Sequence, residues 1–188
     1  MTSRAQFTLE PSPREGGASI DVIVSNLGIN NFEQPAAVLN ECYRVAKPGA
    51  HVLLTTNLSG HMAEFYQVYR SVLVELGQHD RLDALDAHIQ HRGTLRSVTQ
   101  LLAQSGFSVS EVANDTFRLR FADGSALLRH SFIRLGFVQA WRAVAPADAV
   151  RQTFRTLELR LNDIAREHGV LTLTVPMACF VAYKDRLL

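Results

Sequence analysis

The sequence lacks most features that mark a metal-binding, membrane or nucleic-acid-binding protein. It has two cysteines, Cys42 and Cys179, far apart and without a Cys-x-x-Cys or Cys/His metal spacing. It has no long apolar run typical of a transmembrane helix, and its first residues lack the apolar core of a signal peptide. The formal net charge is only +1, which gives no bulk attraction to nucleic acid or to an anionic membrane. We therefore expect a cytoplasmic protein with two reduced, buried thiols and neither a nucleic-acid nor a membrane partner.

Two further absences concern small-molecule sites. His88 and His91 are three residues apart on an expected helix, a spacing that can bind metal, but no third ligand is evident. No Gly-x-Gly-x-x-Gly or Gly-x-Gly-x-Gly motif occurs, and the glycine pair Gly16-Gly17 follows no expected strand. A metal site is thus not expected, and a loop that grips phosphate is missing from these residues.

What is present indicates a globular α/β protein. Hydrophobic residues make up 47% of the 188 residues and charged residues 20%, which is ordinary for one folded domain. Residues 1–19 are expected to form a tail. The β-branched run at 20–28 predicts a strand buried on both faces, and residues 35–46 predict an amphipathic helix. A Lys47-Pro48-Gly49 turn and a second buried strand at 51–58 complete a parallel strand–helix–strand unit.

The rest of the chain alternates helices with strands. Helices are expected at 61–76, 80–91, 94–104, 125–135 and 147–168, with Gly77 ending the first and Thr94 capping the third. Strands are expected at 107–112, at 116–122 as a separate strand or an extension, and at 170–183 with an interruption at Pro176.

Three segments together resemble the class I S-adenosylmethionine-dependent methyltransferases. They are Asp21-Val-Ile-Val-Ser-Asn26, Glu41-Cys-Tyr-Arg-Val-Ala-Lys-Pro-Gly49 and the Leu-Leu-Thr-Thr that ends at Thr56. The resemblance is good over 20–58 and looser over 94–112 and 170–184; another doubly wound α/β fold is the main competitor. It implies a seven-stranded sheet of order 3-2-1-4-5-7-6 with strand 7 antiparallel. This chain would supply strands 4, 5, 6 and 7, a partial Rossmann-like sheet.

The resemblance also implies a division of the chain. Residues 20–188 would form a partial methyltransferase domain, in which 117–168 is an insertion that serves as a substrate lid. Strand 1 with its glycine-rich loop, and the acidic residue after strand 2, have no counterpart. Glu10 and Glu15 could imitate that acid but fit solvated tail charges better.

Without strand 1, the strand at 20–26 would present an unpaired apolar edge. Three explanations are open: a truncated chain, a missing half supplied by another chain or a symmetry mate, or a tail that covers the edge.

The candidate cofactor site is the turn after the first expected strand. The resemblance implies that Ser25, Asn26, Leu27 and Gly28 run past the methionine part of S-adenosylmethionine and the transferring methyl. The alternative is a strand-end turn that bonds to its own backbone.

The candidate substrate residues lie in loops and in the insertion. The resemblance makes Asn30 and Asn31 part of the pocket wall, with a simple helix-entry loop as the alternative. His61 could act as a general base, although a surface histidine at a helix start is the more probable interpretation. Arg120 and His130 could bind an anionic substrate group, and a solvated strand face is the alternative for the arginine. Methyl transfer needs mainly positioning and desolvation, so no catalytic residue is assigned.

Two functions follow as expectations. The first is a methyltransferase for a small-molecule acceptor, with S-adenosylmethionine as cofactor, impaired as this chain alone. The second is a non-catalytic module that dimerises, or binds a complementing chain, through its open sheet edge.

Overall fold

The computed structural model describes residues 17–186, so most of the predicted tail lies outside the described residues. One mixed sheet has the order β1-β2-β4-β3, in which β1 and β2 are parallel and β4 is antiparallel to both of its neighbours. This order matches strands 4-5-7-6 of the resembled fold, and the α/β prediction is confirmed. The strands are β1 (Ile20–Asn26), β2 (Ala46–Asn57), β3 (Ser108–Phe121) and β4 (Leu171–Tyr183).

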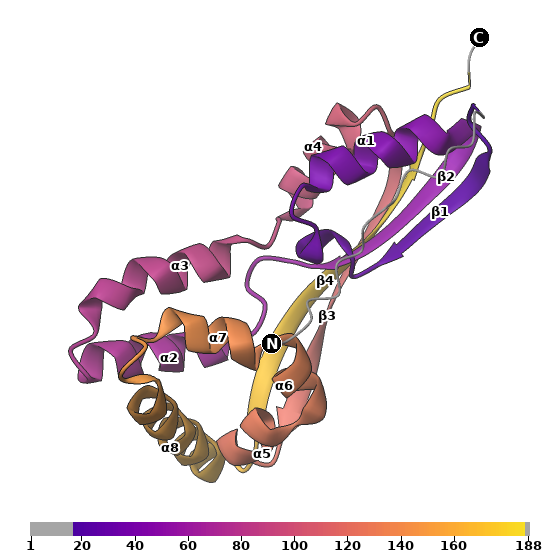
Figure 1. Cartoon of the computed structure of the whole chain (residues 1–188). Helices are drawn as coiled ribbons and strands as arrows, with labels where there is room; N and C mark the ends of the chain where they lie inside the picture. The colour runs from indigo at the N-terminus through magenta and orange to yellow at the C-terminus, as the bar shows by residue number, and fades with distance from the viewer. Residues whose placement is uncertain (1–16, 187–188) are drawn as a thin grey trace.

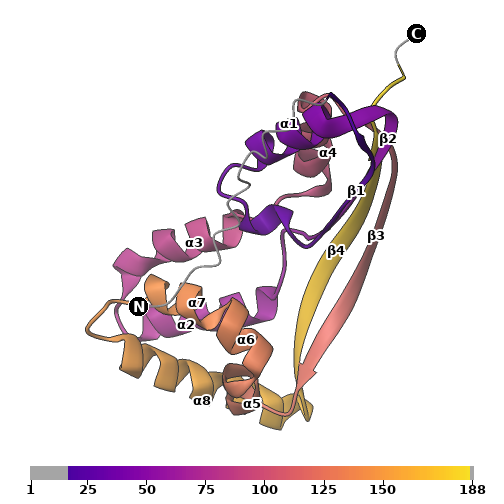
Figure 2. The ribbon, with the colours of Figure 1, turned by 45° about the vertical axis from the view of Figure 1, so that its right-hand side comes forward.

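The helices form two groups along the sheet (Figure 1). The sheet lobe holds α1 (Pro35–Val45), the 3₁₀ helix η1 (Ile29–Asn31) and α4 (Leu95–Gln104), with η1 against β2 and α4 against β3 and β4. The helical lobe covers the far halves of β3 and β4 on one side. Its helices are α2 (Ala63–Glu75), η2 (His79–Arg81), α3 (Leu82–Gln90), α5 (Gly124–Arg129), α6 (Ser131–Gly136), α7 (Val138–Val144) and α8 (Val150–His168). Both groups lie on the same side of the sheet (Figure 2).

Strand β1 is an edge strand whose apolar side chains are exposed. Val22 and Val24 keep 54% and 69% of their surface accessible, so the prediction of a strand buried on both faces is wrong. The reason is that α1 and α4 cover one face only, and β2 is its only strand neighbour among the described residues. The predicted open edge is confirmed for that part of the chain.

The Lys-Pro-Gly segment is a bulge rather than a turn between helix and strand. Helix α1 ends at Val45, β2 begins at Ala46, and the pairing jumps from Ile20↔Ala46 to Val22↔His51. The extra residues arch out because Gly49 takes a positive φ of 83°. Its N–H donates to the Lys184 carbonyl at 2.8 Å, so the bulge is tied to the end of β4.

Strands β3 and β4 form one long ribbon. The two strands expected at 107–112 and 116–122 are a single strand, because β3 pairs with β4 from Ser108↔Tyr183 to Phe121↔Leu171. Pro176 does not interrupt β4. It lies just beyond the last β2·β4 pair, Asn57↔Met177, so its missing N–H costs no ladder bond. Its carbonyl accepts from the Leu58 N–H at 2.9 Å on that same side.

Local helix signals were good predictors of where helices end. The Thr94 side chain accepts from the Ser97 N–H at 3.1 Å, and Ser97 Oγ accepts from the Thr94 N–H at 2.8 Å, which forms a capping box. Gly77, with φ of 71°, follows α2 as predicted. The helix expected at 125–135 is instead two helices, because His130 has an extended backbone with ψ of 130°.

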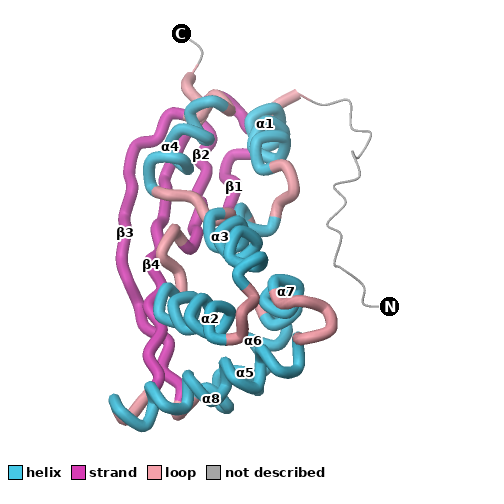
Figure 3. The backbone as a smooth tube through the Cα atoms, turned by 90° about the vertical axis from the view of Figure 1, so that its left-hand side faces the viewer, coloured by secondary structure: helices cyan, strands magenta, loops and turns pink. Residues whose placement is uncertain are grey.

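Figure 3 shows the two groups of helices along the sheet. The buried residues form two cores, one for each group. The sheet-lobe core is mainly aliphatic and consists of Ile29, Leu39, Ala46, Ala50, Val52, Leu54, Leu58, Val98, Leu102, Phe107, Ala178, Phe180 and Ala182. The helical-lobe core is larger and more aromatic and consists of Met62, Phe65, Tyr66, Tyr69, Val72, Leu73, Leu85, Leu127, Ile133, Trp141, Val144, Leu157, Leu161, Ala165, Leu171 and Leu173.

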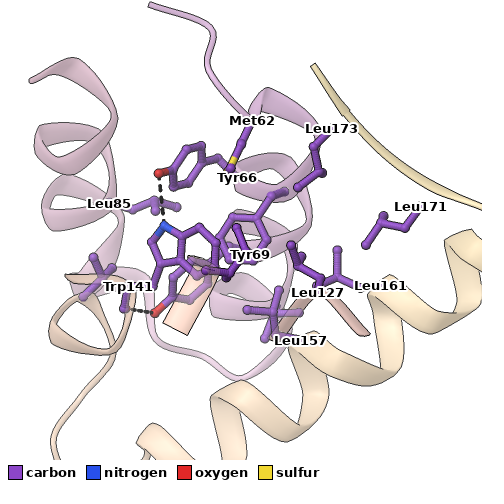
Figure 4. Packing of buried hydrophobic residues seen from close by; sticks show 14 of the residues in the cluster. Met62, Tyr66, Tyr69, Leu85, Leu127, Trp141, Leu157, Leu161, Leu171 and Leu173 are labelled. Carbon is purple, nitrogen blue, oxygen red and sulfur yellow. Dashed lines mark hydrogen bonds between the residues drawn. The ribbon is translucent and has the colours of Figure 1, made fainter. Parts of the chain in front are cut away.

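Trp141 is the centre of the helical-lobe core (Figure 4). It is fully buried and stacks on Phe65 with a centroid distance of 3.9 Å. Its Nε1 donates to Tyr66 Oη at 3.1 Å, and its carbonyl accepts from Tyr69 Oη at 2.8 Å. Packing therefore accounts for Trp141 without a ligand. Helix α2, which precedes the predicted 117–168 insertion, belongs to the same core, while the insertion's role as a lid stays a prediction.

Two smaller points concern the thiols and membranes. Cys42 and Cys179 are free and half-buried, so the expectation of two buried thiols holds only in part. Within residues 17–186, no helix is both long and apolar enough to cross a bilayer.

Candidate functional site

The turn that follows β1 is held in place by β2. Because the two strands are parallel, their carboxyl ends meet at one edge of the sheet, where α/β proteins bind ligands. Asn26 Oδ1 accepts from Thr55 Oγ1 at 2.5 Å, and the Leu27 N–H donates to the Thr55 carbonyl at 3.0 Å. Leu27 has a positive φ of 57°, a conformation uncommon outside glycine. The backbone from Ser25 to Gly28 is thus fixed next to β2.

Gly28 is needed here for space. A Cβ atom at this position would lie 2.7 Å from Ser25 Oγ and 3.2 Å from Phe32 Cζ. Its φ of −75° suits any residue, so steric room and not backbone freedom favours glycine. The turn is consequently compact.

Asn30 and Asn31 use their amide nitrogens to hold the loop. Asn30 Nδ2 donates to the Asn57 carbonyl at 3.0 Å, which ties η1 to the end of β2. Asn31 Nδ2 donates to the Leu27 carbonyl at 3.1 Å, which agrees with the simple loop interpretation. Four of the predicted site residues and these two asparagines therefore lie at one edge of the sheet. Their roles toward a ligand stay predictions.

His61 lies in the segment that joins the two lobes and is buried, so the surface interpretation is wrong. Only 4% of its surface is exposed, and its ring stacks on Phe137 with a centroid distance of 5.6 Å and an angle of 18°. Neither Nδ1 nor Nε2 has a hydrogen-bond partner among the described residues. Burial, followed by the charges of Arg92 and His91, lowers the pKa of His61 to about 3. The ring is therefore neutral at pH 7.

A second connection between the lobes runs beside the first. The Ser59 N–H donates to the Gly93 carbonyl at 2.9 Å, so the chain before α2 and the chain before α4 are tied together. On that second connection, Arg92 Nη1 donates to His91 Nε2 at 3.1 Å, while the buried Arg92 Nε has no partner in the described chain. Burial lowers the pKa of Arg92 from its ordinary value.

Two neighbouring side chains complete a polar cluster at the junction of the lobes. Tyr66 Oη, which accepts from Trp141, also forms a hydrogen bond with His88 Nε2 at 3.1 Å. Burial, and then the charges of His91 and Arg92, lower the pKa of His88 to about 4. We name the set His61, Tyr66, His88, His91 and Arg92 the junction cluster.

The sequence showed only part of the junction cluster. The His88 and His91 spacing was visible, but nothing in it indicated that the Arg92 charge acts on His61. Residues 17–186 contain no group of three or more His, Cys, Asp or Glu side chains that could hold a metal ion.

Arg120 and His130 lie apart from this region. Arg120 is exposed on β3 and pairs with Thr172, near the far end of the ribbon. His130 is exposed and meets the Phe121 ring edge-on at 5.6 Å. Among described residues, no hydrogen bond joins either side chain to Ser25–Gly28 or to His61. The solvated-face interpretation agrees with the exposure of Arg120, and a substrate role stays a prediction.

A surface groove lies elsewhere. It lies between α4 and β3, at the opposite edge of the sheet from β1, and is lined by Leu95, Arg96, Thr99, Val112 and Asn114 among others. It is widely open to solvent, whereas a small-molecule site usually encloses most of its ligand. We therefore place the candidate site at the sheet edge and the junction and not in this groove.

Known proteins resemble this chain in sequence pattern and in fold. A family model described as a methyltransferase domain matches residues 2–112, which is more than half of the chain. Among the curated proteins, none matches the sequence. The YcgJ protein of Bacillus subtilis has a similar structure, with 15% identity, a TM-score of 0.50, and coverage of 91% of this chain and 66% of that one.

Two other structures are more distant. A candidate methyltransferase from Bacillus halodurans is 18% identical, with a TM-score of 0.47 and coverage of 88% and 64%. Phosphoethanolamine N-methyltransferase 2 from Haemonchus contortus, solved with phosphomonomethylethanolamine and S-adenosylhomocysteine, is 18% identical, with a TM-score of 0.41 and coverage of 91% and 34%. The chain thus spans less than two thirds of the length of each of these proteins.

Proposed function

Because the chain belongs to the methyltransferase domain family, we propose that it forms part of an S-adenosylmethionine-dependent methyltransferase that acts on a small-molecule acceptor. One observation carries the proposal. The order β1-β2-β4-β3, with parallel β1 and β2, places the Ser25–Gly28 turn at the sheet edge where α/β proteins bind ligands. The turn would contact the methionine end of the cofactor and leave the methyl exposed to an acceptor held between the lobes.

The chemistry asks little of the protein beyond placement. The nucleophilic atom of the acceptor attacks the methyl carbon in line with the carbon–sulfur bond that breaks. Aligning the nucleophile with that bond and excluding water provide most of the increase in reaction rate. The chain offers a fixed turn on one side and a packed helical lobe on the other. The proposal covers acceptors that are methylated on O, N, C, As or S.

We also propose that these 188 residues bind the cofactor weakly by themselves. They contain no Gly-x-Gly loop and no identified acid for the ribose hydroxyls. In the proposed site, only the turn after β1 and the adjoining loop remain to contact S-adenosylmethionine.

The test is a titration of this chain with S-adenosylhomocysteine, followed by calorimetry and by amide NMR. We expect a Kd of roughly 1 mM or weaker, with shifts confined to residues 25–31 and 55–57. Micromolar binding would overturn the proposed impairment. Absence of any shift at that edge at saturating ligand would overturn the cofactor assignment. Asn26→Ala should remove the shifts, whereas Asn114→Ala, an exposed asparagine on β3, should leave them unchanged.

The second candidate is a non-catalytic module that self-associates, or binds a complementing chain, through the β1 edge. The exposed Val22 and Val24 favour it, because an unpaired apolar edge strand is a template for pairing. Light scattering over a concentration series distinguishes the two candidates. A monomer at all concentrations counts against edge-mediated self-association. For either candidate, the two free thiols are consistent with the reducing cytoplasm that we expect.

A further inference from the structure

The junction cluster carries buried polar atoms that have no hydrogen-bond partner among the described residues. Arg92 Nε is buried and unpartnered, and so are both ring nitrogens of His61. A buried polar group without a partner costs on the order of 1–3 kcal/mol, and more when it is charged. Buried groups of this kind are a common sign of a ligand that supplies the missing bonds.

The chemistry of these unpartnered groups indicates the charge of the ligand that would fit them. Arg92 Nη1 donates to His91 Nε2, and His91 Nδ1 bonds to the His88 carbonyl, so both ring nitrogens of His91 already have partners. The remaining guanidinium N–H groups of Arg92 and one N–H of neutral His61 can only donate. A ligand that satisfies them must be an acceptor.

Nearby carboxylates do not fill this role. In the part of the chain that the structure describes, Arg92 forms no ion pair. Glu64, in the first turn of α2, accepts instead from the N–H and hydroxyl of Thr174. Asp86 of α3 is paired with Arg70. The positive charge of Arg92 thus stands uncompensated at the boundary of two lobes.

We propose that the junction cluster binds an oxyanion, a carboxylate or phosphate group, through Arg92 and His61. The planar guanidinium would hold two oxygens, and the His61 N–H would hold one. That this oxyanion belongs to the methyl acceptor rests on the proposed function; that the site takes an oxyanion does not. Its position between the end of β2 and α2 would let an acceptor bridge the junction and the Ser25–Gly28 turn.

The ring signals of His61 give a direct test. Inorganic phosphate in one titration and acetate in another are added to the whole chain, with sodium chloride at matched ionic strength as the control. The Arg92 charge is the second cause, after burial, of the lowered pKa of His61, and an oxyanion beside Arg92 would oppose that charge. At pH 7 the His61 ring signals should therefore shift saturably as either anion binds. Chloride should give no saturable shift. The anion that binds more tightly, phosphate or acetate, shows whether the site prefers a phosphate or a carboxylate group.

Variants make the result specific. Arg92→Met keeps the aliphatic stem and should weaken binding at least tenfold, and Arg92→Lys should weaken it less, since lysine keeps the charge but loses the fork. Arg96→Met, an exposed arginine on α4, should bind like the parent. If Arg92→Met fails to fold, Arg92→Lys decides the matter.

The proposal is overturned if neither anion shifts His61 saturably, or if Arg92→Met (or Arg92→Lys in its place) binds like the parent. No methyl transfer or cofactor is needed in these titrations. Loss of S-adenosylhomocysteine binding and loss of oxyanion binding are therefore separate outcomes.

Discussion

The two lobes differ in how completely their apolar residues are covered. In the helical lobe, α2, α5, α7 and α8 surround Trp141, and the core residues there are almost inaccessible to water. In the sheet lobe, α1 and α4 cover one face, while β1 exposes Val22 and Val24 on the other. The helical lobe also exposes apolar side chains, such as Leu135 and Phe132 of α6, but only the sheet lobe has an edge strand with an exposed apolar face among the described residues. We expect the helical lobe to be the more stable of the two.

The largest expected effect is that of Trp141→Ala. It removes a buried indole and leaves the Tyr66 hydroxyl without its donor, which should cost about 3–5 kcal/mol. Hydrogen exchange should show lost protection in α2, α7 and α8, with β1 and β2 little affected. Phe107→Ala, in the sheet-lobe core, should give the reverse pattern. If either variant loses protection equally in both lobes, the chain unfolds as one unit, and the expected difference in stability between the lobes does not exist.

Gly124→Ala should destabilise the helical lobe selectively. An added Cβ would lie 2.5 Å from Leu161 Cβ and 3.0 Å from the Glu158 carbonyl, so α5 and α8 must move apart. Overpacking of this kind costs about 1–3 kcal/mol in urea unfolding. Gly136→Ala is the matched control, because no atom lies within 4 Å of its added Cβ. If the two variants unfold at the same urea concentration, the close contact of α5 with α8 does not exist in solution.

Glu64 should make the helical lobe sensitive to acid. Burial alone would raise its pKa, but the bonds from the Thr174 side chain and N–H outweigh burial and lower it. A carboxyl with a lowered folded pKa stabilises above its unfolded value of about 4.3, and that stabilisation is lost as the pH falls through the folded pKa.

Allowing for the solvent exposure of Glu64, the effect should be about 1 kcal/mol. Unfolding of Glu64→Gln from pH 6 down to pH 3 should show a shallower loss of stability than the parent. Parallel curves for the two proteins would show that Glu64 contributes nothing to acid sensitivity.

Val24→Lys should have the smallest effect on stability and a selective effect on association. The side chain is 69% exposed, so the free energy of unfolding should change by no more than about 0.5 kcal/mol. A lysine on an edge strand opposes pairing, so any concentration-dependent association of the parent should decrease. Val74→Lys, on exposed α2 surface in the helical lobe, should leave association unchanged. The same response from both variants would remove the β1 edge as the associating surface.

Local features were predictable from the sequence, and non-local ones were not. The Thr94 cap and the Gly77 stop depend on a few neighbouring residues, and both are confirmed. The burial of β1 was wrong because a run of β-branched residues predicts a strand but cannot show what covers it. Pro176 was misjudged for a similar reason: whether a strand tolerates proline depends on which side its neighbour lies.

The site shows the same division. The turn after β1 could be placed because strand order follows from the family resemblance. The junction cluster could not, because His61 and Arg92 belong to separate connections that meet only when both lobes are folded. The buried state of His61 depends on Phe137, from a third segment. No single stretch of sequence therefore shows that His61 is buried or that it lies in the junction cluster.

The β3–β4 ribbon has a mechanical consequence. At about 3.4 Å per residue, the pairing from Ser108 to Phe121 makes a beam roughly 45 Å long on which both lobes are mounted. Its ladder, which has one register shift between Val109 and Glu111, resists stretching and shear. Beyond the Asn57↔Met177 pair only β3 and β4 remain, and a two-stranded ribbon twists more readily than a wide sheet. We therefore expect motion of one lobe against the other to be mainly a torsion about this beam.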